Sequence, residues 1–274
     1  CDWSSDVCSS DLYQVALQHY TNLQGMSLKE LLEEAETEEE QGTRWKHRKL
    51  RTRLIQYQNY LTSNYNYNTC RTYMSKVKTF YHDNLIEIHH LPRINKKNTI
   101  ISKPLTYKDL PTKENIQDAY NLATPIIRAY LLFAASSGCA MRECLNLKKE
   151  DYYKWIQPYT TREVIKEHKD IIPIIHLKRQ KTNKYYYTFC TPEATREIGL
   201  FLEGRDDNDE RLFNISMKHL GKKLSVLNDK LGLGRVNNMG VLRTHTLRKF
   251  HATHLSMGEN GLSLDEIDAL QGRS

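Results

Sequence analysis

Helical periodicity dominates the first part of the chain. Apolar residues between positions 15 and 35 recur at helical spacing, and Ser27 can cap a helix that begins after it. From Trp45 to Leu61 an apolar stripe runs between faces rich in Lys and Arg, and residues 69–84 repeat that pattern. The sequence therefore predicts a small domain of amphipathic helices, at least two of them basic.

Proline marks the end of this domain. The stretch 91–111 holds three of the seven prolines, and proline does not continue a helix. We therefore predict a helical domain over 13–95, a linker over 96–111 and a second domain over 112–274.

The second domain reads as mainly helical with one hairpin. Two β-rich arms, 171–177 and 185–189, flank a polar turn, which is typical of a β-hairpin. The predicted fold class is mainly α (α+β), with a small antiparallel sheet in an α-rich domain. The helices are expected at 115–123, 125–136, 192–203, 216–230, 245–256 and 263–271.

Both ends of the sequence differ from those of a typical gene product. Residues 1–12 lack an initial Met and have neither the basic leader nor the apolar run of a secretory signal. We interpret them as a non-native leader, the alternative being a genuine disordered N-terminus. At the other end an amphipathic pattern extends to Leu270, close to the last residue, Ser274, and we interpret the chain as a C-terminally truncated fragment.

Charge is distributed in blocks along the 274 residues, whose net charge is +7. Residues 1–41 carry one Lys against ten acids, residues 42–103 carry 13 Lys and Arg against two acids, and the remainder carries 26 against 21. Seven Glu between 30 and 40 are most simply a solvated helix face. The basic block predicts a polyanionic partner.

Cysteine usage and hydropathy exclude several classes of protein. The six cysteines show no paired C-x-x-C spacing, so neither a disulfide scaffold nor a zinc site is predicted. With a mean hydropathy of −0.67, no stretch is apolar enough to span a bilayer. We expect a cytoplasmic protein without a metal or another cofactor.

Three segments carry candidate chemistry: SSGCAMRECLNLKKEDY at 136–152, RQKTNKYYY around Lys181, and THTLRKFHATHL at 244–255. His245 and Arg248 are three residues apart and share one helix face. Arg offers a planar fork to phosphate oxygens, His transfers protons, and a Lys in a hairpin turn can act as a mobile acid. These groups suit stabilisation of a pentavalent phosphate during strand cleavage.

In these segments the chain resembles the tyrosine recombinase (phage integrase) family, most closely its archaeal integrases. The resemblance covers roughly 13–274 and includes the phrases LKELLEEAETEEE and VKTFYHDNLIEI. It implies a DNA core-binding domain at 13–95 and a catalytic domain, incomplete at its C-terminus, at 112–274. It also implies an enzyme that cleaves and rejoins double-stranded DNA through a 3′-phosphotyrosyl link, as a tetramer of itself on two duplexes. The sequence leaves open which mobile element or chromosomal system it would serve.

The resemblance assigns a role to each candidate residue. Arg142 and Arg248 would clamp the scissile phosphate, and Lys181 would be the general acid for the leaving 5′ hydroxyl. His245 would be the acid/base histidine, and Arg273 stands where the family usually has His or Trp. The family's nucleophile is a tyrosine some ten residues beyond this last position, whereas all 17 Tyr here lie at or before Tyr187.

Some assignments depart from the family's pattern. The family's first arginine usually stands two or three residues before a glutamate, whereas Arg142 directly precedes Glu143, a rotation of about 100° or more around a helix. Arg142 can instead form a surface ion pair. Lys178 and Lys184 compete with Lys181 for the role of acid. Arg273 can donate to phosphate but cannot shuttle protons. His251 and His254 match no catalytic position and are expected in helix packing or on the surface.

Two other functions compete with the recombinase hypothesis. The first is a catalytically inactive DNA-binding relic or regulator that occupies a former recombination site. The second is a type IB topoisomerase, which uses a similar active site to relax DNA; the linker and N-terminal phrases argue against it.

Overall fold

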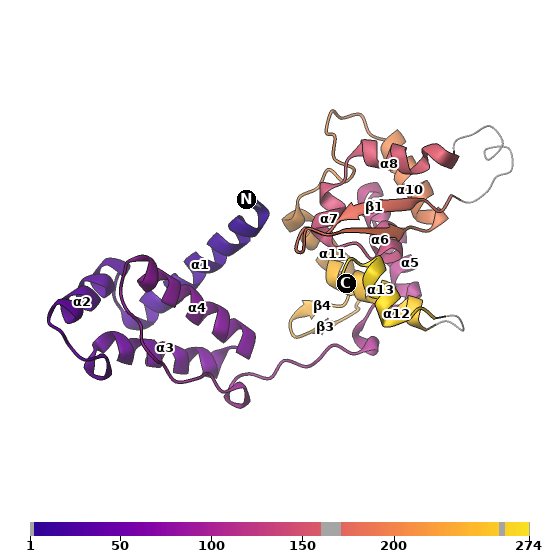
Figure 1. Ribbon diagram of the computed structural model, residues 1–274. Coiled ribbons are helices and arrows are strands. Elements are labelled where there is room, and N and C mark those ends of the chain that lie inside the picture. Colours follow the sequence, from indigo (N-terminus) through magenta and orange to yellow (C-terminus); the bar gives the residue numbers. More distant parts are fainter. Residues whose placement is uncertain (1–2, 160–170, 258–260, 274) are drawn as a thin grey trace. The chain divides into compact units, whose positions relative to one another are not determined.

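The computed structural model describes residues 3–159, 171–257 and 261–273. The chain divides into two compact units, one ending at Ser102 and the other beginning at Lys103 (Figure 1). This division lies inside the proline-containing stretch 96–111. No helix among the described residues is long and apolar enough to cross a membrane.

The first unit is helical. It contains α1 (Trp3–Gln24), α2 (Leu28–Glu40), α3 (Lys49–Asn64) and α4 (Tyr67–Asp83), with short 3₁₀ turns at Trp45–His47 and Lys96–Asn98. Tyrosines fill much of its core: Tyr20, Tyr57 and Tyr81 are fully buried, and the hydroxyls of Tyr20 and Tyr81 lie 3.1 Å apart. Helix α1 begins at Trp3 and therefore includes most of the segment that we set aside as a leader.

Two sequence predictions for this unit were wrong in detail. The apolar stripe from Trp45 is not one helix, because Arg48 is extended between the 3₁₀ turn and α3. The glutamates of α2 are also not all solvated. Glu34 pairs with Arg53 at 2.6 Å, and Glu38 is buried and accepts the Lys49 amide at 2.7 Å, near the start of α3. Helix α2 thus neutralises part of the basic block, because the strongest acidic and basic segments are packed together.

The second unit surrounds the buried helix α6 (Pro125–Ser137), against which α10 and α12 pack (Figure 1). Strands β1 (Ile174–Lys178) and β2 (Tyr185–Phe189) pair antiparallel, with Ile174 opposite Phe189. Their inner residues, among them Ile175 and Tyr186, are buried in the same core. The other helices are α5 (Lys113–Leu122), α7 (Met141–Asn146), α8 (Lys149–Ile156), α10 (Pro192–Glu203), α11 (Met217–Lys230), α12 (Thr244–Ser256) and α13 (Leu264–Leu270), with 3₁₀ turns at Tyr107–Asp109 and Gln157–Tyr159.

The predicted fold class, mainly α with a small antiparallel sheet, is confirmed. Sequence periodicity missed a second hairpin, β3 (Arg235–Val236) and β4 (Met239–Gly240). Each strand has only two residues, too few to show alternation. The only local signal is the turn pair Asn237 and Asn238, both with positive φ, a conformation that Asn tolerates.

Candidate active site

The three segments with candidate chemistry meet at one place in the second unit. Gly138 ends α6, Glu143 lies on α7, Arg179 follows β1, and Arg248 lies on α12. The end of α13, at Gln271, joins them. Side chains that are far apart in the sequence thus converge around the Gln271 carbonyl.

Arg248 is the buried centre of this group, with 5% of its surface exposed. One guanidinium nitrogen donates to the Gly138 carbonyl at 2.5 Å and the other to the Gln271 carbonyl. Burial, with the nearby charges of Arg179 and Arg273, lowers the pKa of Arg248. Both direct partners are neutral, so a full positive charge is held in place without an ion pair among the described residues.

Glu143 is the buried carboxylate of the site. Its Oε1 lies 3.3 Å from Nη1 of Arg179, and its Oε2 accepts the Tyr186 hydroxyl at 2.7 Å and the Ala140 amide at 3.1 Å. The pKa of Tyr186 is raised, first by burial and then by the neighbouring Cys139 and Glu143 side chains. The Tyr186 hydroxyl therefore stays protonated and donates. The carboxylate is therefore fixed from three directions.

Two glycines in the left-handed region let aromatic rings close on the site. Gly138 has φ +63°, and a Cβ there would lie 2.4 Å from Nδ1 of His251. Gly272 has φ +61°, and a Cβ there would lie 2.7 Å from the Tyr186 ring. Larger residues would displace these rings, so the sequence needs glycine at both positions.

His251 is buried beneath the site and contacts the side chain of Gln271. It is 5% exposed, and Nε2 of Gln271 lies 2.9 Å from its Nδ1. Burial, together with the charges of Arg248, Arg273 and His254, lowers the pKa of His251 to about 4. The imidazole is therefore neutral at pH 7 and can accept from the Gln271 amide.

His245 and Arg273 lie at the edge of the group, where both side chains are exposed. Desolvation, and then the cations Lys249, Arg243, Arg273 and Arg248, lower the pKa of His245. Arg273 also has an exposed ion pair with Asp268 at 3.4 Å. A histidine that stays neutral beside several cations can accept a proton near pH 7.

Lys181 lies in the turn between β1 and β2, and its side chain is exposed. The turn is closed by the Arg179 amide, which donates to the Lys184 carbonyl at 2.7 Å, and by Asn183, whose φ is +59°. Lys178 lies over the Tyr185 ring at 5.3 Å. The base of this turn contacts the site through Arg179, while Lys181 projects from the turn into solvent.

Arg142 lies on α7 immediately before Glu143 and is partly exposed. Successive helical side chains diverge by about 100°, so Arg142 does not point where Glu143 points. The positions two and three residues before Glu143 are Met141 and Ala140. The role of Arg142 as a phosphate clamp stays a prediction. Sequence reasoning missed Arg179, for which the only signal is a third cation in the run Lys178, Arg179, Lys181.

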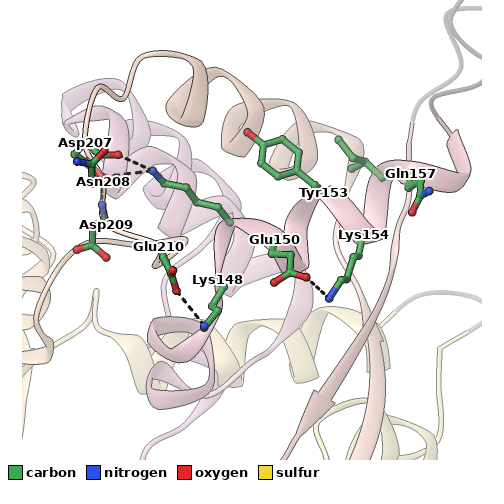
Figure 2. A pocket seen from close by; sticks show the side chains of 11 residues that line it. Lys148, Glu150, Tyr153, Lys154, Gln157, Asp207, Asn208, Asp209 and Glu210 are labelled. Atoms are coloured by element: carbon green, nitrogen blue, oxygen red, sulfur yellow. Dashed lines mark hydrogen bonds and ion pairs between the residues drawn. The ribbon is translucent and has the colours of Figure 1, made fainter.

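In the described part of the chain no three His, Cys, Asp or Glu side chains gather as metal ligands. A surface hollow of about 730 Å³ lies between α8 and residues 207–210 (Figure 2). Its lysines already have carboxylate partners, with Lys148 3.1 Å from Glu210 and Lys154 2.6 Å from Glu150. This balanced hollow contrasts with the excess of arginine around Gln271.

Comparison with known protein families and with curated proteins gives no match for this chain. Solved structures do match. A lambda integrase dimer (residues 75–356) bound to a COC′ core site is similar with a TM-score of 0.55 and 11% identity, over 81% of this chain and 78% of that chain. The XerH site-specific recombinase, bound to a difH substrate, is similar with a TM-score of 0.53 and 16% identity, over 82% of this chain and 64% of that chain. A lambda integrase tetramer bound to a Holliday junction is similar with a TM-score of 0.52 and 12% identity, over 82% of this chain and 64% of that chain.

These likenesses concern the fold, because all the identities are below a fifth. The chain spans 64% of the XerH chain that it matches. The chain therefore shares the mainly helical fold of site-specific recombinases and integrases.

Proposed function

We propose that this chain is part of a tyrosine recombinase that cleaves and rejoins double-stranded DNA through a 3′-phosphotyrosyl intermediate. The observation that carries the proposal is the buried Arg248, fixed by two neutral carbonyls and flanked by Arg179 and Arg273. Such a rigid excess of guanidinium groups is suited to a phosphate whose negative charge grows in the transition state.

The assigned roles follow the position of each group. Arg248 would hold a non-bridging phosphate oxygen, and the exposed Lys181 would deliver a proton to the leaving 5′ oxygen. His245, with its lowered pKa, would accept the proton of the attacking hydroxyl. Arg273 would add a phosphate donor from the exposed edge of the group. Arg142 is the candidate for the first clamp that the sequence resemblance assigns.

Duplex binding would come from exposed cations of the basic block. Within 42–103 these are the residues that α2 does not neutralise, among them Arg44, Lys46, Arg71 and Lys78. Each phosphate contact releases counterions, so binding should weaken steeply with salt. We propose that the partners are double-stranded DNA and further copies of the chain, as a tetramer on two duplexes, in the cytoplasm.

We propose that none of the tyrosines in residues 1–274 acts as the nucleophile of this reaction. Positions 188–274 contain no tyrosine, and donors that polarise a phosphate cannot replace the attacking oxygen. These residues alone should therefore bind DNA without becoming covalently attached to it.

A nicked suicide substrate tests the proposal. Residues 1–274 should bind the duplex with a strong salt dependence and form no denaturation-resistant adduct. A chain extended beyond Ser274 by a segment that carries a tyrosine should form the adduct, and changing that tyrosine to Phe should abolish it.

Three results would count against parts of the proposal. Binding that is equal in dilute and concentrated salt would contradict the phosphate-contact model. An adduct with residues 1–274 would identify an upstream tyrosine as nucleophile. An extended chain that binds DNA but never forms an adduct would support the alternative, a DNA-binding relic or regulator.

A further inference from the structure

We propose that Arg179, rather than Arg142, is the second guanidinium that contacts the scissile phosphate, an assignment that rests on the strand-cleavage function proposed above. Arg179 stands at the base of the β1–β2 turn, two residues before Lys181. The same short segment would then bring both a phosphate clamp and the proton donor to the site.

The first support is a shared acceptor. Nη1 of Arg179 donates to the Gln271 carbonyl at 3.2 Å, and Nη2 of Arg248 donates to the same oxygen. Two guanidinium groups that share one oxygen must lie next to each other. Their mutual repulsion contributes to the lowered pKa of Arg248. One oxyanion can therefore contact both groups.

The second support is the balance of charge. Glu143 is the one carboxylate paired with Arg179 among the described residues, and it also accepts from Tyr186 and Ala140. Among the described residues Arg248 donates only to neutral carbonyls, and Arg273 adds a further positive charge nearby. One buried carboxylate thus faces several cations, and an added anion would offset the remaining charge.

The third support is the direction of the Arg179 side chain. Its contacts with Glu143 and Gln271 both use Nη1, so neither engages the edge formed by Nε and Nη2. The side chain keeps 16% of its surface exposed, whereas Arg248 is more deeply buried. A guanidinium that is anchored at one nitrogen can present its other edge to phosphate.

The fourth support is the position that Arg179 occupies. The Glu143 carboxylate contacts Arg179 through Oε1 and the Ala140 amide through Oε2. Arg179 therefore lies close to position 140, one of the two positions at which the resemblance would place the family's first arginine. Ala140 has no side chain beyond Cβ, so a guanidinium that reaches this place comes from the hairpin.

The test measures inorganic phosphate binding to residues 1–274 with ¹⁵N-labelled arginine. The Nε–H resonances of Arg179 and Arg142 are assigned with single Arg→Lys variants and followed during titration. The Arg179 resonance should move with saturating behaviour, and the Arg142 resonance should not. The reverse pattern, or no response from Arg179, would overturn the assignment.

Variants separate anion binding from a purely structural role. Glu143→Gln removes the buried carboxylate, so Arg179 can then be changed without leaving that charge unpaired. In this background Arg179→Gln should weaken phosphate binding by about tenfold to a hundredfold, the value of one charge-assisted hydrogen bond. Arg142→Gln is the matched control and should change binding less than twofold. Equal binding with and without Arg179 in the Glu143→Gln background would show that Arg179 only neutralises Glu143.

Two further measurements complete the test. Arg179→Lys in the unaltered chain keeps an ion pair with Glu143 but loses the planar fork, so it should fold normally and bind phosphate about tenfold more weakly. Duplex DNA binding, measured on the same proteins, reports on the proposed function separately. Duplex binding without an Arg179 response would reject only the assignment of Arg179, whereas an Arg179 response without duplex binding would reject only the function.

Discussion

Removing a single hydroxyl group, in Tyr186→Phe, should destabilise the second unit more than the same change at another buried tyrosine. Tyr186 is 6% exposed and donates to the buried Glu143 carboxylate at 2.7 Å. Without this donor the carboxylate keeps Arg179 and the Ala140 amide but loses one of its charge-assisted bonds. Hydrogen bonds to charged groups contribute about 1.5–3 kcal/mol, so we expect a loss of about 2 kcal/mol in the free energy of unfolding.

Tyr152→Phe is a matched control. Tyr152 is also 6% exposed, in the same unit, and its hydroxyl donates to the neutral Thr195 carbonyl at 3.0 Å. A neutral hydrogen bond contributes about 0.5–1.5 kcal/mol, so this change should cost about 1 kcal/mol. Both substitutions remove one oxygen and no carbon. The Tyr186 hydroxyl also has a long contact of 3.9 Å with the Cys139 sulfur, so the difference between the variants reports mainly on the acceptor carboxylate.

Urea unfolding followed by tryptophan fluorescence measures both losses. Trp155 is the tryptophan of the second unit, so Trp3→Phe and Trp45→Phe in every protein make the signal specific to that unit. A difference of about 1 kcal/mol should also appear as a further drop of about 2–4 °C in the melting temperature of Tyr186→Phe. Equal losses for the two variants, or a larger loss for Tyr152→Phe, would refute the claim that the hydrogen bond from Tyr186 to the buried Glu143 side chain is the stronger of the two.

Two other predictions concern packing and pH. Gly138→Ala should lower the free energy of unfolding more than the control Gly232→Ala. Both glycines have φ above +60°, but of the two only Gly138 would place a new Cβ against a ring, 2.4 Å from His251. We expect a loss of about 1 kcal/mol for the control and at least twice that for Gly138→Ala, measured by urea unfolding. Stability should also fall with acidification, since the pKa of His251 is about 4 in the folded chain and 6.5 in an unfolded one: its contribution is present above pH 6.5 and is lost as pH falls toward 4, by up to about 3 kcal/mol. His251→Gln should flatten this part of the stability profile, and an unchanged slope would show that another group titrates there.

Much of the fold was determined by local sequence. Helix periodicity predicted most of the helices, because an amphipathic stripe must face a core wherever the helix packs. Ser27 accepts the Glu30 amide as a cap, and Pro125 occupies the first turn of α6. The hairpin was predicted from two β-rich arms and its polar turn. These features depend on residues that are close together in the sequence, so they can be predicted without the tertiary structure.

Only the tertiary structure determines which charged side chains meet at the site and which partners they have. The sequence shows acidic and basic blocks, but only packing shows that Glu34 pairs with Arg53 while the described hydrogen bonds of Arg248 go to backbone carbonyls. Arg179 reaches Glu143 and Gln271 across 36 and 92 positions. Such partners are chosen by the packing of α6, α12, α13 and the hairpin, and no local periodicity encodes them. The sequence by itself therefore determined the helices and the candidate chemistry, and the fold decided which guanidinium groups converge.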